Sequence, residues 1–210
     1  MNSPRHRVEA LRQTTAPAVE NIDIDDPTAA GENLDILTQE VLQLEARPLR
    51  ARRIIVRLHE ASVVFHSTNL RVRARTTVNG QLAAFTVFGP RARGTLNGLP
   101  LRPGVISAVG SGCPGELVVE AGYESVAILV PPAALEAHCT ARRRGPFRAP
   151  AGIAVLDASE SLSRGLFDWG RRLAGTDSRQ PSLFHDRKET LAAAQTELLD
   201  RLLAVLDSTT

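Results

Sequence analysis

Residues 85–130 read FTVFGPRARGTLNGLPLRPGVISAVGSGCPGELVVEAGYESVAILV, and this stretch decides the fold. Short runs rich in β-branched residues alternate in it with turn residues. The runs cover Phe85–Phe88, Gly94–Leu96, Gly104–Val109, Glu116–Glu120 and Ser125–Val130. The pair Asn97-Gly98 is typical of a type I′ hairpin turn, because both central residues of that turn need φ > 0. Strands this short at this spacing predict an antiparallel sandwich or a small barrel.

The residues before this stretch continue the strand pattern. We predict strands over 41–46, 50–58, 61–66 and 70–76, with a short helix or an extended lead-in over 32–42. The last of these strands alternates most cleanly: Leu70, Val72 and Ala74 face one way, and Arg71, Arg73 and Arg75 face the other. This period of two marks a strand with one face in the core.

The residues after it turn to a helical pattern. We predict a short helix over 131–141, a strand or extended link over 149–156, and two longer helices over 160–173 and from about 186 to 207. The leucine stripe of the last helix is broad enough to pack against the strands and against a second chain. The residues assigned to a homodimer interface are Leu191, Leu198, Leu202 and Val205.

The order of elements, strands first and helices last, predicts an all-β barrel with appended C-terminal α-helices. We divide the chain into a flexible N-terminal arm (1–31), a β-barrel (32–150) and a helical dimerisation segment (151–210). The arm is polar and rich in Pro, Thr and Ala, which is typical of a segment without its own core.

Composition limits the classes of function. The formal net charge is only +2, which argues against nucleic-acid binding over the whole surface. Two cysteines, Cys113 and Cys139, make no disulfide framework. No apolar run approaches the length of a membrane span, and the N-terminus lacks the apolar core of a signal peptide. We therefore expect a protein of the reducing bacterial cytoplasm, without a membrane partner.

No catalytic or metal-binding motif stands out, so we predict that the chain is not an enzyme and has no cofactor. The histidines are His6, His59, His66, His138 and His185. None forms H-x-H, and no Cys or carboxylate spacing completes a metal site. There is no G-x-S-x-G. The run Ser111–Pro114 is a Gly-rich turn without the lysine of a phosphate cradle.

A ligand pocket inside the barrel is the more plausible site, because a small barrel either fills its interior or encloses one small ligand. The polar and aromatic candidates for its lining are Phe65, His66, Asn69, Arg71, Arg73, Phe85, Phe88 and Tyr123. If the arginine face of residues 70–76 points inward, it fits a carboxylate or a phosphate. The outward alternative is favoured, because the opposite face carries the apolar side chains.

The ordered elements resemble the N-terminal sensing domain of AraC-type transcription regulators, especially the group that includes the ethanolamine-operon activators. The resemblance covers about residues 35–207, and its most specific part is NGLPLRPG at 97–104, followed by 110–115. It implies a cupin-like or jelly-roll β-barrel that senses a small-molecule effector, followed by helices that pair two subunits.

The resemblance also implies a DNA-binding part that is absent here. Such regulators continue with two helix-turn-helix units, whereas this sequence stops at Thr210. We expect contact with operator DNA only through a domain beyond residue 210. Two alternatives stay open: a cupin-type small-molecule enzyme, and a stand-alone ligand-binding barrel.

Overall fold

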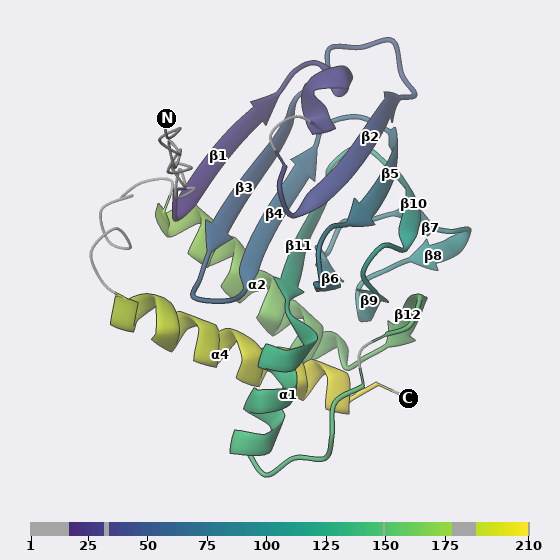
Figure 1. Cartoon of the computed structure of the whole chain (residues 1–210). Helices are drawn as coiled ribbons and strands as arrows, with labels where there is room; N and C mark the ends of the chain where they lie inside the picture. The colour runs from purple at the N-terminus through teal and green to yellow at the C-terminus, as the bar shows by residue number, and fades with distance from the viewer. Residues whose placement is uncertain (1–16, 32–33, 149, 178–187, 210) are drawn as a thin grey trace, which may run out of the picture.

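The computed structural model describes residues 17–31, 34–148, 150–177 and 188–209. Its strands form two antiparallel sheets that face each other (Figure 1). The seven-stranded sheet has the order β1-β3-β4-β11-β6-β9-β12, and the five-stranded sheet has the order β2-β5-β10-β7-β8. The two sheets together form a β-sandwich. The prediction of strands followed by helices is confirmed, but a single closed barrel is not what the sheets form.

The strands of the larger sheet are β1 (Val19–Ile24), β3 (Ala51–Arg57), β4 (Ser62–Thr68), β6 (Ala83–Phe88), β9 (Val105–Val109), β11 (Tyr123–Val130) and β12 (Ile153–Asp157). Those of the smaller sheet are β2 (Leu37–Gln43), β5 (Val72–Val78), β7 (Gly94–Leu96), β8 (Leu99–Leu101) and β10 (Pro114–Val119). The other described elements are η1 (Pro27–Gly31), α1 (Pro132–Ala141), α2 (Glu160–Asp177) and α4 (Lys188–Asp207). The described helices are all shorter or more polar than a membrane span requires.

The predicted hairpin at residues 97–98 joins β7 to β8. Asn97 and Gly98 both have positive φ, at 48° and 80°, as a type I′ turn requires. Leu96 pairs with Leu99 directly across the turn. The local turn chemistry of the sequence therefore fixes the register of this hairpin.

Two segments differ from the predicted division of the chain. Residues 19–24, placed in the flexible arm, form β1 and pair with β3 from Val19–Val56 to Ile24–Ala51. Arg57 of β3 holds this edge strand with an ion pair to Glu20 at 3.1 Å. Residues 153–157 fall within the predicted helical segment but form β12 beside β9, which confirms the strand or extended link predicted over 149–156. Residues 1–16 of the arm lie outside the described part of the chain.

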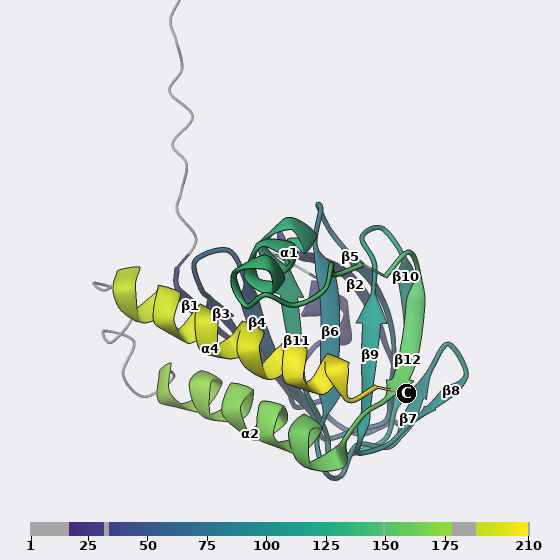
Figure 2. The same cartoon turned by 90° about the horizontal axis from the view of Figure 1, so that it is seen from below.

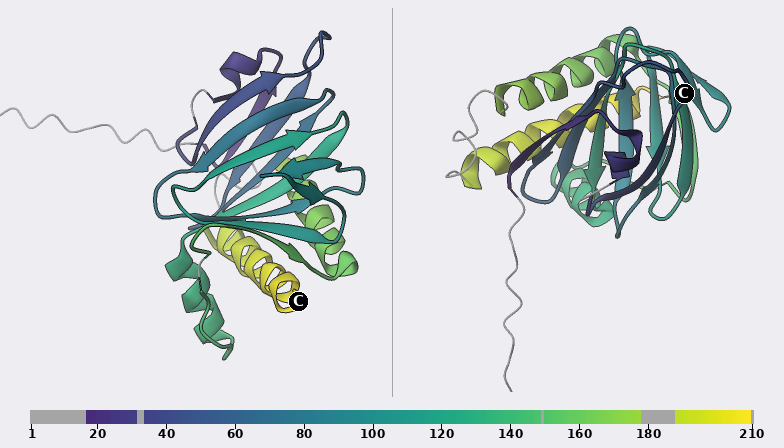
Figure 3. Two further views of the ribbon diagram at one scale, coloured as in Figure 1. Left: turned by 90° about the vertical axis from the view of Figure 1, so that its right-hand side faces the viewer. Right: turned by 90° about the horizontal axis from the view of Figure 1, so that it is seen from above.

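Helices α2 and α4 cover the outer face of the seven-stranded sheet, while the five-stranded sheet lies on its inner face (Figures 2 and 3). The larger sheet is therefore buried on both sides, and alternate residues of its strands enter two different cores. In β4, Val63 and Phe65 face the helices, whereas Val64 faces the other sheet. The space between the sheets holds the candidate site.

The leucine stripe of α4 is used within the chain. Leu198 and Leu202 have 0% exposure and Val205 has 1%, and all three belong to the core between the helices and the larger sheet. Leu191 is half-buried against the same core. Leu198, Leu202 and Val205 are therefore not available to a second subunit in this arrangement, which corrects their assignment to a homodimer interface, whereas Leu191 keeps part of its surface exposed.

Helix α2 approaches the larger sheet most closely, among its glycines, at Gly170. A Cβ added at Gly170 of α2 would lie 2.5 Å from a methyl carbon of Val126 in β11. We expect Gly170→Ala to lower the free energy of unfolding by about 1–3 kcal/mol through overpacking, despite the better helix propensity of alanine. Gly165→Ala in the same helix is the matched control.

The control has the opposite expected sign. An added Cβ at Gly165 meets no atom within 4 Å, so alanine there should raise the free energy of unfolding by up to about 1 kcal/mol. Urea denaturation of both variants measures the difference. Equal shifts in the two variants would contradict the packing argument, since helix propensity alone would then explain both.

Candidate ligand-binding site

A cavity of about 140 Å³ lies between the two sheets. Most of its wall is apolar, with valine, leucine, isoleucine and alanine side chains from both sheets, among them Val64, Val78, Leu129 and Leu37. The polar side chains in the wall are Gln39, Arg53, His66, Thr68, Thr76, Thr86, Ser107, Tyr123 and Ser125. The cavity is therefore an apolar space with a limited number of placed polar groups, as is usual for small-molecule sites.

The polar groups are concentrated on neighbouring strands of the seven-stranded sheet. Arg53 of β3 pairs in register with His66 of β4, and His66 pairs with Ser125 of β11. Tyr123 lies two residues from Ser125 on the same face of β11. We call Arg53, His66, Tyr123 and Ser125 the polar row. Because inward-facing residues at one register level are neighbours, antiparallel pairing alone brings this row together.

Arg53 is the charged member of the polar row, and it is only 2% exposed. Its Nη1 donates a hydrogen bond to the carbonyl oxygen of Ala30 at 2.8 Å, and its Nη2 donates to Oε1 of Gln39. Gln39 in turn donates from Nε2 to Oγ1 of Thr76 at 3.0 Å. Burial lowers the pKa of Arg53 to about 10, opposed by the negative charge of Glu20, so the guanidinium stays charged at neutral pH.

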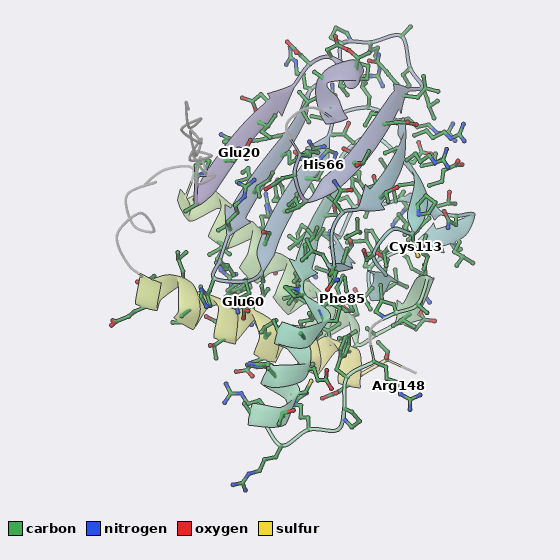
Figure 4. The ribbon with its side chains drawn as sticks, in the orientation of Figure 1. Glu20, Glu60, His66, Phe85, Cys113 and Arg148 are labelled. Atoms are coloured by element: carbon green, nitrogen blue, oxygen red, sulfur yellow. The ribbon has the colours of Figure 1, made fainter. Side chains whose placement is uncertain are left out.

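His66 lies inside the cavity, between the sheets (Figure 4). Its ring centroid is 6.4 Å from that of Tyr123, and the Tyr123 ring is 6.3 Å from that of Phe88. Burial, assisted by the positive charge of Arg53, lowers the pKa of His66 to about 3. The imidazole is therefore neutral at physiological pH, and it offers one donor and one acceptor nitrogen.

Tyr123 is 2% exposed, and burial raises the pKa of its phenol, with a smaller opposing effect from Ser125. The phenol therefore stays protonated at neutral pH. The polar row thus offers one fixed positive charge beside neutral donors and acceptors. This combination can bind and orient a polar head group while the apolar wall holds the rest of a molecule.

Three of the eight predicted pocket residues line the cavity: His66, Phe88 and Tyr123. Phe65 and Phe85 lie on the opposite face of the same sheet, in the core under the helices. Figure 4 shows Phe85 nearer to the helices than His66 is. Alternation explains this split, because His66 follows Phe65 directly and must face the other way.

The other predicted pocket residues are exposed. Asn69 lies in the turn before β5 and accepts a hydrogen bond from the backbone N–H of Arg50 at 2.6 Å. Arg71 and Arg73 pair on the outer surface with Glu120 at 3.1 Å and Glu116 at 2.5 Å. The arginine face of residues 70–76 therefore points outward. This is the alternative that the sequence favoured, because the opposite face of the strand is apolar.

The sequence prediction missed the main charged group of the cavity, which is Arg53. The pattern around it, Arg53, Ile55 and Arg57 alternating with Ile54, Val56 and Leu58, shows no purely polar face. Ile54, Ile55 and Val56 are all at most 3% exposed, which is the sign of a strand buried on both sides. The part of this signal that the sequence itself shows is the continuous apolar run Ile54–Val56 next to Arg53.

Other chemistries have little support among the described residues. The structure holds no group of three or more His, Cys, Asp or Glu side chains near enough to share a metal ion within that part of the chain. Cys113 is half-buried in its turn, and its Sγ lies 3.8 Å from the carbonyl oxygen of Ala151.

Comparison with known proteins relates the fold to one regulator. The solved structure of the AraC-like transcriptional activator CuxR matches 82% of this chain with a TM-score of 0.52 and 14% identity. The chain spans only 63% of the length of CuxR. Vicilin from Corylus avellana (hazelnut) matches 73% of this chain and 51% of its own at 15% identity, but its TM-score of 0.20 carries no argument. At such identities the CuxR match shows a shared fold.

Searches by sequence add nothing to this relationship. No family model matches the chain. No curated protein matches it either. The fold is thus that of a domain found in an AraC-like activator, which supports the resemblance in its coarse form.

Proposed function

We propose that this chain is the effector-sensing domain of an AraC-type bacterial transcription regulator. It binds one small molecule between its sheets and thereby controls a DNA-binding unit that follows it. The single observation that carries the proposal is the cavity of about 140 Å³ with a charged group and neutral polar groups on one wall. The fold shared with the activator CuxR supports the regulatory role.

The mechanism is a shift between two populations of the domain. A ligand that binds one arrangement of the sheets and helices better than another shifts the equilibrium by its difference in affinity. A tenfold response requires a difference of only about 1.4 kcal/mol. In this mechanism the chain binds its ligand without chemical change, so we propose no enzymatic activity and no cofactor.

The homodimer and the cytoplasmic location stay part of this proposal. Since Leu198, Leu202 and Val205 are buried within the chain, a dimer would use the exposed face of the helices. Light scattering over a series of protein concentrations measures the oligomeric state.

Two linked experiments test the proposal. The first is a thermal-shift screen of small metabolites, because a molecule that binds only the folded state raises the melting temperature. The control is Ala74→Leu, which adds side-chain volume to the cavity wall. We expect molecules that stabilise the natural chain to stabilise this variant less.

The second experiment asks whether binding controls transcription. The chain is joined to the helix-turn-helix units of another AraC-type regulator, and transcription from that regulator's promoter is measured with and without the molecules found. A response that Ala74→Leu abolishes supports the sensing role. Binding without any response in this reporter would favour a stand-alone ligand-binding protein instead.

A further inference from the structure

The buried guanidinium of Arg53 has no compensating negative charge in direct contact among the residues that the structure describes. No described carboxylate forms an ion pair with it. Glu20 acts on it only at longer range, and pairs with Arg57 instead. Burying a charge costs free energy unless it is paired and hydrogen-bonded. Its two hydrogen bonds go to neutral oxygens, those of Ala30 and Gln39.

The groups beside Arg53 also keep free hydrogen-bonding capacity toward the cavity. Within the described part of the chain, the side chains of His66 and Ser107, which both line the cavity, form no hydrogen bond. The Tyr123 hydroxyl has Ser125 as its neighbour. Ser107 and Ser125 are 2% and 5% exposed, so these hydroxyls have no access to bulk solvent. Buried polar groups normally have partners, and here the cavity is where those partners would lie.

The size and the apolar wall of the cavity limit the rest of the ligand that carries this hydrogen-bonding group. Its volume of about 140 Å³ is close to that of an engineered cavity of about 150 Å³ that binds benzene. The five-stranded sheet contributes mainly apolar side chains, among them Val41, Val72, Ala74 and Val119. An occupant therefore has a compact apolar body, about the size of a six-membered ring.

We propose that the effector is a small organic monocarboxylate with a compact apolar body. Its carboxylate pairs with the guanidinium of Arg53 and accepts hydrogen bonds from the imidazole N–H of His66 and from the Tyr123 and Ser125 hydroxyls. Its body lies against the apolar side chains of the smaller sheet. This inference rests on the proposed sensing function and names the ligand class of that same site.

Other ligand classes fit these groups less well. A metal cation or an amine would meet the like charge of Arg53. A sugar would leave that charge unpaired and would place several hydroxyls against valine and alanine side chains, which cannot bond them. A phosphate monoester carries close to two negative charges at neutral pH, and one guanidinium neutralises only one of them. A carboxylate matches the planar fork of one guanidinium through two parallel hydrogen bonds.

The test compares ligands of equal shape and different charge on the full chain. The probes are benzoate and isovalerate, each beside its amide, and binding is measured by calorimetry and by thermal shift. We expect each carboxylate to bind at least tenfold more tightly than its amide, because a hydrogen bond to a charged group is worth more than a neutral one. Equal binding of acid and amide would overturn the proposal, as would the absence of any carboxylate binding.

Two variants locate the interaction. Arg53→Gln should lower the affinity for benzoate on the order of tenfold or more and leave benzamide nearly unchanged. The matched control Arg71→Gln, on the outer surface of β5, should leave both affinities unchanged. Unaltered benzoate binding by folded Arg53→Gln would contradict the assignment. If that variant does not fold, Ala74→Leu must weaken benzoate binding for the proposal to stand.

The ligand class and the sensing function fail in different ways. If the metabolite screen finds neutral or cationic molecules whose binding Ala74→Leu weakens, while no carboxylate binds, the ligand class is wrong and the sensing function stands. If a carboxylate binds at Arg53 but the reporter does not respond to it, the ligand class is right and the regulatory role is wrong.

Discussion

Leu202→Ala is expected to lower the free energy of unfolding by about 2–5 kcal/mol, the range for large-to-small changes in a well-packed core. Leu202 has 0% exposure and belongs to the core between the helices and the seven-stranded sheet. Truncating it loses apolar burial and leaves a cavity that the surrounding strands can close only in part. Urea denaturation followed by circular dichroism measures the loss.

The matched control is Leu162→Ala in the other long helix, α2. Leu162 is 41% exposed, so its truncation should change the free energy of unfolding by at most about 0.5–1 kcal/mol. The same samples are examined by light scattering. If Leu202→Ala dissociated a dimer without destabilising the chain, the intramolecular role of the α4 leucines would be wrong.

Acidification is expected to destabilise the natural chain through His66. Its pKa is about 3 in the folded state, against an ordinary value near 6.5 for an unfolded chain. Between these two values the unfolded state binds a proton that the folded state excludes. The contribution of His66 to the free energy of unfolding is therefore retained above pH 6.5, and it is lost as the pH decreases toward 3.

The size of this effect follows from the linkage relation. Between pH 7 and pH 5 the His66 contribution should reduce the free energy of unfolding by about 2 kcal/mol. The variant His66→Gln carries no titrating group at this position and should lack this component. The difference between the two proteins, measured by urea denaturation at several pH values, isolates His66 from the other titrating groups.

A parallel decline of the natural chain and His66→Gln between pH 7 and pH 5 would mean that His66 is not held neutral in the cavity. The same measurements with benzoate present give a further check on the environment of the ring. A bound anion beside His66 would raise its pKa and reduce the pH dependence.

The sequence was most informative where local chemistry decides the structure. The Asn97-Gly98 turn needs positive φ at both residues, and only a few residue types supply it. The alternation of residues 70–76 correctly separates a core face from an arginine face, because β5 is buried on one side only. In both places the information lies within a few neighbouring residues.

The sequence was less informative where distant segments decide. Half of the residues of β1 are Glu, Asn or Asp, and its strand conformation depends on pairing with β3 and on the Arg57–Glu20 ion pair. The leucine stripe on α4 predicts an apolar contact, but its width does not show whether the stripe packs against the sheet of the same chain or against a second subunit. The choice between a closed barrel and two facing sheets depends likewise on which strands meet at the edges.

The candidate site shows the same division. His66, Phe88 and Tyr123 were predicted by residue type, and they reach the cavity because their alternation faces the inner side of the sheet. Arg53 was missed because β3 is buried on both faces, so a period of two gives no contrast there. The continuous apolar run Ile54–Val56 beside Arg53 is the signal that would have found it.

Burial of the larger sheet on both sides has a consequence for how the domain would report an occupant. Ser125 faces the cavity, and Val126, the next residue of β11, packs against α2 at Gly170. One peptide bond separates the two contacts. At Gly170 the helix and the strand lie too close together for an added Cβ to fit. A bound molecule that displaces Ser125 would therefore also displace the contact between Val126 and α2. The effect of binding would reach the helix through β11 itself, without the movement of a loop.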